Sequence, residues 1–258
     1  MTQGAGAASP RRRLALVLVE PAGPLNVGSV ARLCANFSSH SLAIELRLVA
    51  PRCDHRGEEA LRMAVHGHAL LHQASLHADL ASALVDCAVV LATSGRGEGE
   101  PLPVQDLDPA LQWLQQQDWD DRPAALVFGR EDRGLSAAEL LQAGALLQID
   151  TGADYRSLNL SHAVALVLHA LHQRLQQPRL SPQRQTPLAP RGSVEAMLAD
   201  AEALLLEVGF LYPHTAAARM AKLKALLQRG GLQPDEVALL RGMVRQCRWA
   251  AGRDARTS

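Results

Sequence analysis

Aromatic side chains and long hydrophobic runs are both scarce in this chain of 258 residues. Phenylalanine, tryptophan and tyrosine make up 3% of the sequence, so leucine, valine and alanine must build the core. No apolar run reaches the roughly 18 residues that a membrane-spanning helix requires, so we expect no membrane association. The four cysteines form no Cys-x-x-Cys pair, and the first residues show no signal-peptide pattern. We therefore expect reduced thiols and a cytoplasmic protein.

Three missing motifs narrow the possible chemistry. The chain has no Gly-x-Ser-x-Gly elbow, which argues against a serine hydrolase. No Gly-x-Gly-x-x-Gly follows the first predicted strand, which argues against an oxidoreductase that binds a nicotinamide dinucleotide. The closest histidine pairs, His66 with His68 and His169 with His172, have no cysteine or carboxylate partner at ligand spacing, so we expect no metal site.

Charge is balanced over the whole chain, with 26 basic and 26 acidic side chains, but it is unevenly distributed. Residues 14–173 carry 10 basic and 19 acidic side chains, whereas residues 174–258 carry 13 and 7. A basic tail beside an acidic body indicates an anionic partner, with nucleic acid as the first candidate. The alternative is attraction between the two halves of the chain or between two subunits.

Short apolar runs alternate with helical patterns through the first 176 residues. Strands are predicted at 14–19, 44–49, 88–92, 124–128 and 146–149, and the continuous apolar run at 14–19 is typical of a buried parallel strand. Helical patterns lie at 26–37, 58–65, 77–85 and 159–175, and Ser136 with Glu139 predicts a capping box for another helix. This alternation predicts an α/β fold in which helices cover both faces of a parallel sheet.

The composition divides the chain into five parts. We expect a disordered basic arm over 1–13, an α/β domain over 14–176, a linker rich in proline and arginine over 177–192, a helical extension over 193–250 and a tail over 251–258. Ser193, Ala216 and Pro234 mark the predicted starts of three helices in the extension.

Three polar or glycine-rich blocks, at 26–32, 126–136 and 155–161, each follow a predicted strand. Ligands bind at such turns in open α/β sheets, so the blocks predict one composite site. Arg32 offers a planar fork for a phosphate, Glu131 can accept hydrogen bonds, and Ser157 and Asn159 precede a helix.

Each of these residues also has an ordinary structural interpretation. Arg32 could be a surface arginine, and Glu131 could form a loop ion pair with Arg130 or Arg133. Ser157 could be a turn residue and Asn159 a simple N-cap. The glycines beside the strand ends could serve ordinary tight turns: Gly28, Gly129 and Gly134.

Basic side chains gather on the predicted helices of the extension and in the arm. On the third helix, Arg241, Arg245 and Arg248 fall at i, i+4 and i+7, on one side. The further candidates for contact with RNA are Arg219, Lys222, Lys224, Arg11, Arg12 and Arg13. Such a set could follow a phosphate backbone, or it could form solvated helix faces.

In their order along the chain, the three blocks resemble the motifs of the SPOUT superfamily, and within it the SpoU/TrmH family of RNA ribose 2′-O-methyltransferases. Residues 26–32 match its Asn-x-Gly-x-x-x-Arg motif, 128–135 its Phe-Gly-x-Glu-x-x-Gly-Leu motif, and 157–164 its Ser-Leu-Asn motif. Thr93-Ser94-x-Arg96 and residues 209–242 are similar to the TrmJ branch. The likeness covers about residues 12–250.

The resemblance implies a C-terminal trefoil knot in the α/β domain, S-adenosylmethionine as cofactor, and a homodimer. It implies methylation of a ribose 2′-oxygen in RNA, most often in tRNA at position 32 of the anticodon loop. The residues it marks as catalytic are Arg32, Ser157, Asn26 and Glu131. Those it marks as cofactor-binding are Thr93, Ser94, Gly95, Gly129, Ile149, Arg156, Ser157, Leu158 and Asn159.

Other functions stay open at this point. The same reaction could act on rRNA or on another tRNA site, and a knotted protein could bind RNA without catalysis. Because a guanidinium is a poor general base, we interpret Arg32 as a phosphate clamp and alkoxide stabiliser, not as a base.

Overall fold

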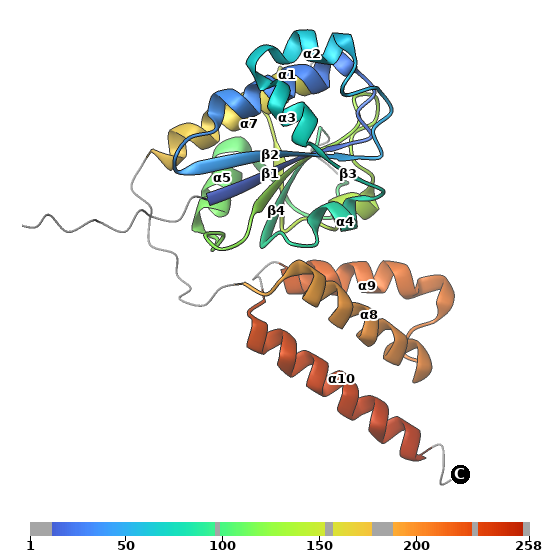
Figure 1. Cartoon of the computed structure of the whole chain (residues 1–258). Coiled ribbons are helices and arrows are strands. Elements are labelled where there is room, and N and C mark those ends of the chain that lie inside the picture. Colours follow the sequence, from blue (N-terminus) through green and yellow to red (C-terminus); the bar gives the residue numbers. More distant parts are fainter. Residues whose placement is uncertain (1–11, 96–98, 153–156, 177–187, 229–231, 255–258) are drawn as a thin grey trace, which may run out of the picture.

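Seven parallel strands form a single sheet in the N-terminal part of the protein (Figure 1). The computed structural model describes residues 12–95, 99–152, 157–176, 188–228 and 232–254. The strands are β1 (Arg12–Val19), β2 (Leu42–Val49), β3 (Ser75–His77), β4 (Val89–Thr93), β5 (Val104–Asp106), β6 (Ala124–Phe128) and β7 (Ala145–Gln148). Their order in the sheet is β3-β2-β1-β6-β4-β7-β5, and every pairing is parallel.

Helices cover both faces of this sheet, which confirms the predicted α/β fold. One face packs against α1 (Pro24–Phe37), α2 (Glu58–Ala64), α3 (His68–Gln73), α5 (Leu107–Gln116) and α7 (Leu160–Leu175), with a 3-10 turn at Val65–Gly67 between α2 and α3. The other face packs against α4 (Leu80–Leu84) and α6 (Ala137–Leu140). Alternate residues of β1 serve the two cores: Leu14, Leu16 and Leu18 point to one face, and Ala15, Val17 and Val19 to the other.

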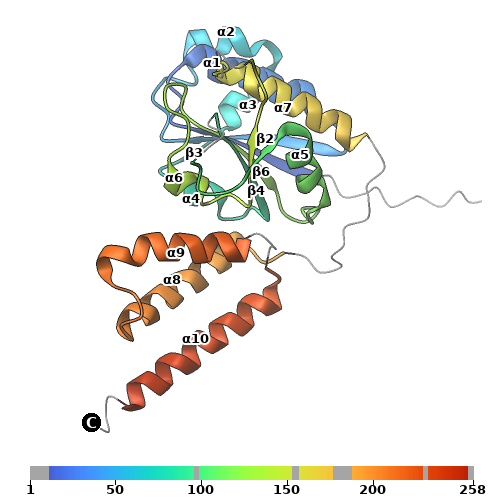
Figure 2. The ribbon, with the colours of Figure 1, turned by 180° about the vertical axis from the view of Figure 1, so that it is seen from behind.

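Three helices form a separate extension with a small core of its own. They are α8 (Arg191–Glu207), α9 (Pro213–Gln228) and α10 (Pro234–Asp254), and their core includes Met197, Leu211 and Met220. Figure 2 shows the extension beneath the face of the sheet that carries α4 and α6. It contacts that face at a few points: the Gly192 amide donates to the Val85 carbonyl at 3.1 Å, and Ala225 of α9 joins the core below the sheet.

Several boundaries differ from those predicted. β1 begins at Arg12, so Arg12 and Arg13 lie in the sheet and not in a disordered arm. The Arg12 guanidinium bonds the Asp120 carboxylate at 2.8 Å and lies 5.1 Å from the centre of the Trp119 ring. Residues 1–11, including Arg11, lie outside the described part of the chain.

The helix predicted over 77–85 is wrong at its start. His77 belongs to β3, and α4 begins at Leu80, where the Asp79 carboxylate caps the helix by accepting from the Ser82 amide at 2.8 Å. β3, β5, α3 and α5 were not predicted at all.

The predicted extension is three-helical as expected, with shifted ends. α8 begins at Arg191 with Pro190 as N-cap, not at Ser193, so the last linker residues are helical. α9 begins at Pro213 and α10 continues to Asp254. Most of the predicted linker, residues 177–187, lies outside the described residues. Within the described ranges, no helix is both long and apolar enough to cross a membrane.

Candidate active site

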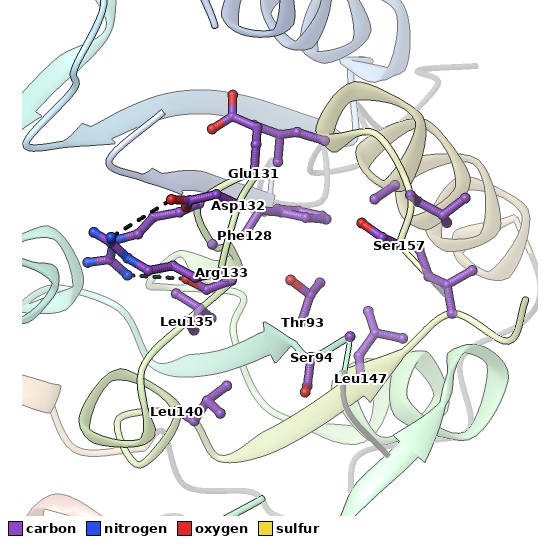
Figure 3. Close-up of a pocket in the computed structure, with 18 of the residues that line it drawn as sticks. Thr93, Ser94, Phe128, Glu131, Asp132, Arg133, Leu135, Leu140, Leu147 and Ser157 are labelled. Atoms are coloured by element: carbon purple, nitrogen blue, oxygen red, sulfur yellow. Dashed lines mark hydrogen bonds and ion pairs between the residues drawn. The ribbon is translucent and has the colours of Figure 1, made fainter. Parts of the chain in front are cut away.

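A pocket of about 360 Å³ opens where β4, β6 and β7 end, at the carboxyl edge of the sheet (Figure 3). Its walls come from the segments after these three strands and from the start of α7. They include Thr93, Ser94, Gly95, Glu100, Phe128, Gly129, Glu131, Leu135, Leu147, Ile149, Ser157 and Leu158. The volume is in the range of pockets that hold small-molecule ligands, and the walls combine apolar surface with hydroxyl groups.

The loop after β6 is built around two glycines. A Cβ at Gly129 would lie 2.3 Å from the carbonyl carbon of Gly134, and Gly134 has a φ of +68°. The amide of Gly134 donates to the Arg130 carbonyl at 2.9 Å, which closes the loop. The tight-turn interpretation therefore holds for both glycines, although both also line the pocket.

Gly28 has a different use. A Cβ there would lie 2.1 Å from the Ala60 carbonyl oxygen, so glycine lets α1 pack directly against α2. Gly28 does not line the pocket. Its place in the first motif is explained by helix packing.

The Glu131 carboxylate holds the beginning of α1. It accepts hydrogen bonds from the amides of Ala22 and Gly23 and from the Asn26 side chain, each at 3.2 Å. In Figure 3 the carboxylate points away from Thr93 and Ser157. A negative charge at a helix N-terminus is favourable, because the amides there have no partners within the helix.

Asn26 continues this chain of bonds to the start of α7. Its carbonyl oxygen accepts from the Asn159 side chain at 3.0 Å, and Asn159 in turn accepts from the amides of Ser161 and His162 at 2.9 and 3.4 Å. Asn159 is therefore the N-cap of α7, which was one of the two interpretations that the sequence allowed for this residue. α1 begins at Pro24 with Gly23 as N-cap, so Asn26 lies within the helix, two residues after its start. The first, second and third motifs thus meet through Asn26, Glu131 and Asn159.

Arg130 forms an ionic hub beside the pocket. Its guanidinium bonds both carboxylate oxygens of Glu139 at 2.9 Å and also bonds Glu20. These bonds raise the pKa of Arg130, and the bond to Glu20 lowers the pKa of that carboxyl group. The loop ion pair suggested for Glu131 with Arg130 or Arg133 is therefore wrong, since both arginines pair with Glu20 instead.

The hydroxyl groups of the pocket come from two sides. Thr93 donates to the Val127 carbonyl at 3.1 Å, and Ser94 donates to the Glu100 carboxylate at 2.5 Å. Ser157 lies opposite them and points into the pocket from the segment before α7 (Figure 3). The Ser136–Glu139 capping box predicted for α6 is confirmed, and α6 supplies Leu140 to the wall.

The structure brings together most of the predicted site residues. Of the cofactor set, Arg156 lies outside the described residues, and Asn159 lies beside the pocket without lining it. Of the catalytic set, Glu131 and Ser157 line the pocket and Asn26 bonds Glu131. Arg32 is exposed on α1 and does not line the pocket of its own chain.

The predicted RNA-binding cations divide into two groups. Lys224 pairs with Glu195 at 2.7 Å, Arg241 with Asp200 at 3.9 Å and Arg248 with Glu207 at 3.5 Å. Within the described part of the chain, Lys222 and Arg245 have no ion-pair partner. The extension therefore uses part of its basic charge to join its own helices.

Comparison with known proteins identifies the class. Residues 13–169 match the family model of the SpoU rRNA Methylase family, and residues 192–257 match that of the tRNA methyltransferase TrmJ, C-terminal domain. The chain belongs to the SpoU methylase family.

The relatives narrow this class to one branch. The chain is 30% identical over 240 residues to the tRNA (cytidine/uridine-2′-O-)-methyltransferase TrmJ of Cronobacter sakazakii, covering 90% of this chain and 95% of that protein. It is 34% identical over 163 residues to the tRNA (cytidine-2′-O-)-methyltransferase TrmJ of Methanocaldococcus jannaschii, covering 62% and 67% of the two chains. The crystal structure of TrmJ from Z. mobilis superposes with a TM-score of 0.76 at 29% identity, covering 90% of this chain and 97% of that one. The resemblance inferred from the three motifs is thereby confirmed.

Among the described residues, no group of three or more histidine, cysteine, aspartate and glutamate side chains could hold a metal ion.

Proposed function

We propose that this protein transfers a methyl group from S-adenosylmethionine to a ribose 2′-hydroxyl of tRNA, at position 32 of the anticodon loop. The observation that carries the proposal is the convergence of the three family motifs on one pocket at the carboxyl edge of the sheet. The naming of relatives such as the C. sakazakii enzyme as tRNA methyltransferases supports tRNA as the substrate.

The pocket fits the proposed cofactor. Phe128, Leu147 and Ile149 offer apolar surface to an adenosine, and the loop after β6 exposes backbone groups. Thr93 and Ser157 offer hydroxyl groups on opposite sides. When bound, S-adenosylmethionine supplies a methyl group on a positively charged sulfur. We also propose that the segment around this pocket is knotted, as in the SPOUT superfamily.

The residues of the site then divide into holding and reacting groups. Glu131 and Asn26 fix α1 relative to the loop after β6, and Asn159 fixes α7, so these three position the pocket walls. Ser157 faces the space where the ribose must enter. Arg32 clamps a phosphate of the RNA and stabilises the developing alkoxide, because its guanidinium is a planar, positively charged hydrogen-bond donor.

The position of Arg32 supports a homodimer with shared sites. Arg32 is exposed and lies outside the pocket of its own chain, so we propose that it acts at the partner's pocket. Subunit mixing tests this arrangement. Arg32→Ala and Ser157→Ala subunits, each inactive alone, should recover about a quarter of wild-type activity when mixed equally, because each mixed dimer has one complete site. Recovery of none would place Arg32 in its own subunit's site.

Methyl transfer from labelled S-adenosylmethionine tests the reaction itself. We expect label in the ribose of bulk tRNA, mapped by nuclease digestion to position 32, and no label with Arg32→Ala. Arg32→Lys should restore little, because a lysine lacks the planar fork. Label in rRNA alone would support ribose methylation but contradict tRNA as the substrate. No label in either RNA would contradict the proposal that this protein is an RNA methyltransferase.

A further inference from the structure

The scarce aromatic side chains are used in opposite ways in the two parts of the protein. In the α/β part, the described ones are buried or packed against the core: Phe37, Trp113, Trp119 and Phe128. In the extension, Phe210, Tyr212 and Trp249 are 62%, 56% and 56% exposed. Because burial of an aromatic ring is favourable, exposed rings that follow one another closely in the chain indicate a surface with a binding role.

Two of the three exposed rings lie at the turn between α8 and α9. Leu211 is 3% exposed, and its amide donates to the Leu205 carbonyl at 2.9 Å, which anchors the turn to α8. With Leu211 turned inward, its neighbours Phe210 and Tyr212 are left on the surface. The Tyr212 ring stacks on that of His214, with centroids 6.0 Å apart and an interplanar angle of 24°. The rings are therefore presented by a fixed segment.

Two basic side chains of α9 follow this turn, and one of them contacts it. Arg219 is exposed, and its guanidinium donates to the Phe210 carbonyl at 3.2 Å, which holds it against the backbone of the turn. Lys222 lies one turn further along α9, exposed and without an ion-pair partner in the described residues. Aromatic faces next to cations are the combination that single-stranded nucleic acids require, since bases stack and phosphates need positive charge.

The turn also lies on the side of the molecule where the reaction is proposed to take place. Figures 1 and 2 both show the connection between α8 and α9 on the side to which the strand carboxyl ends point. An RNA loop held at this turn would thus extend on the same side as the pocket opening.

We propose that Phe210 and Tyr212 form a stacking site for unpaired bases of the RNA substrate, with Arg219 and Lys222 beside its phosphates. The inference rests on the proposed function for the identity of the RNA. It adds a subsite that recognises unpaired bases, separate from the pocket in which methyl transfer is proposed.

The test uses the full-length protein with Phe210→Leu and Tyr212→Leu combined. Leucine keeps apolar bulk at both exposed positions but removes the π-faces, so the fold and the affinity for S-adenosylmethionine should not change. The probes are an anticodon-type hairpin with 2-aminopurine in its loop and an RNA duplex of equal length without a loop. We expect roughly tenfold weaker binding of the hairpin, unchanged duplex binding, and loss of the fluorescence quenching that stacking causes.

Three control variants separate stacking from other effects. Phe210→Tyr with Tyr212→Phe keeps both rings and should bind as the wild type. Leu239→Ala removes another exposed apolar side chain, 66% exposed on α10, and should also bind normally. Lys222→Gln should weaken hairpin and duplex alike and reduce the slope of log affinity against log salt by about one, whereas the double leucine variant should leave that slope unchanged.

Equal binding of the hairpin by the double leucine variant and the wild type would overturn the inference, and so would an equal loss for hairpin and duplex. A shift of the variant to a smaller species in sedimentation would assign the turn to a subunit contact and would also overturn it. Binding needs no methyl transfer, so a wild-type protein that quenches the probe but methylates no tRNA would refute the proposed function and leave the stacking site standing.

Discussion

The α/β part and the helical extension differ in how closely their elements pack. Every β1 side chain from Leu14 to Leu18 is fully buried. Two of the helices that cover the sheet, α1 and α2, pack so closely that Gly28 of α1 lies against the backbone of α2. In the extension, a methyl group added at Gly242 of α10 would point into open space, with no neighbouring element within 4 Å. The difference teaches that the α/β part is specified by close packing, whereas the extension keeps much of its surface available for contact.

Matched glycine substitutions give the largest expected effect. In Gly28→Ala, the new methyl group would lie 2.1 Å from the Ala60 carbonyl oxygen, so α1 and α2 must separate. We expect the free energy of unfolding to fall by about 3 kcal/mol. Gly242→Ala has open space and should raise it by about 0.5 kcal/mol. Urea unfolding of both variants measures the contrast, and similar values would show that the two parts are equally tolerant.

A single-atom change at Asn26 should reduce activity. In Asn26→Asp, the amide that donates to Glu131 at 3.2 Å becomes a second carboxylate oxygen, so two negative charges meet. The beginning of α1 should shift away from the loop after β6, and we expect kcat to fall by about 10- to 100-fold. The double variant Asn26→Asp with Glu131→Gln restores a donor–acceptor pair and should recover part of the loss. Recovery of none would show that Asn26 does more than hold Glu131.

Arg191 begins α8 at the junction between the two parts, next to Gly192, whose amide bonds Val85 of the α/β part. Its side chain is 9% exposed and pairs with Glu195 at 3.7 Å, and burial lowers its pKa against the opposing effect of that carboxylate. In Arg191→Leu, we expect hydrogen exchange to increase across α8–α10 by the equivalent of about 1–2 kcal/mol, while the sheet stays protected. Arg248→Leu removes a more exposed pair with Glu207 within the extension and should change little. An equal increase in hydrogen exchange in both variants would contradict a specific role of Arg191 at the junction.

Acid pH should give the smallest of these effects. The bond from Arg130 lowers the pKa of Glu20; burial raises that of Glu139, but bonds from Arg130 and Ser136 outweigh it. Carboxylates with lowered pKa values stabilise the folded state above their ordinary pKa and lose that stabilisation as pH falls through the folded value. Tm should therefore be flat from about pH 7 to 5 and fall below it, and Arg130→Met should flatten the acid side of the curve. If Tm of this variant fell below pH 5 as steeply as that of the wild type, the ion pairs of Arg130 would not be the cause of the fall.

The sequence predicted the buried strands but not the edges of the sheet. β1, β4, β6 and most of β7 show as apolar runs because both of their faces are covered, whereas the apolar residues of β2 are interrupted by Glu45 and Arg47. β3 and β5 lie at the two ends of the sheet and have three residues each, with only partly buried or exposed side chains. Such strands carry no continuous apolar run, so a pattern search cannot find them.

In the site as well, the sequence indicated which residues belong together in a motif but not which contacts they make with residues far away in the chain. The motifs mark Thr93, Glu131 and Ser157, and in the structure all three line one pocket. The bonds from the Ala22 and Gly23 amides to Glu131 were not predicted, because Glu131 is 108 residues from Gly23 in the chain. The pairing of Lys224 with Glu195 was missed because a helical pattern shows which face a cation occupies, not which helix lies opposite.

The bonds that join the motifs also set an order of events during folding. Asn26 and Glu131 are 105 residues apart in the chain, and Asn26 and Asn159 are 133 apart. Contacts of such long sequence separation form late, because the entropy of closing the intervening chain must first be offset by other structure. Refolding followed by helical circular dichroism should therefore run ahead of refolding followed by recovery of ligand binding. A chain that has already gained most of its helices would still be unable to bind a ligand, since the pocket is completed only when residues 26, 131 and 159 meet.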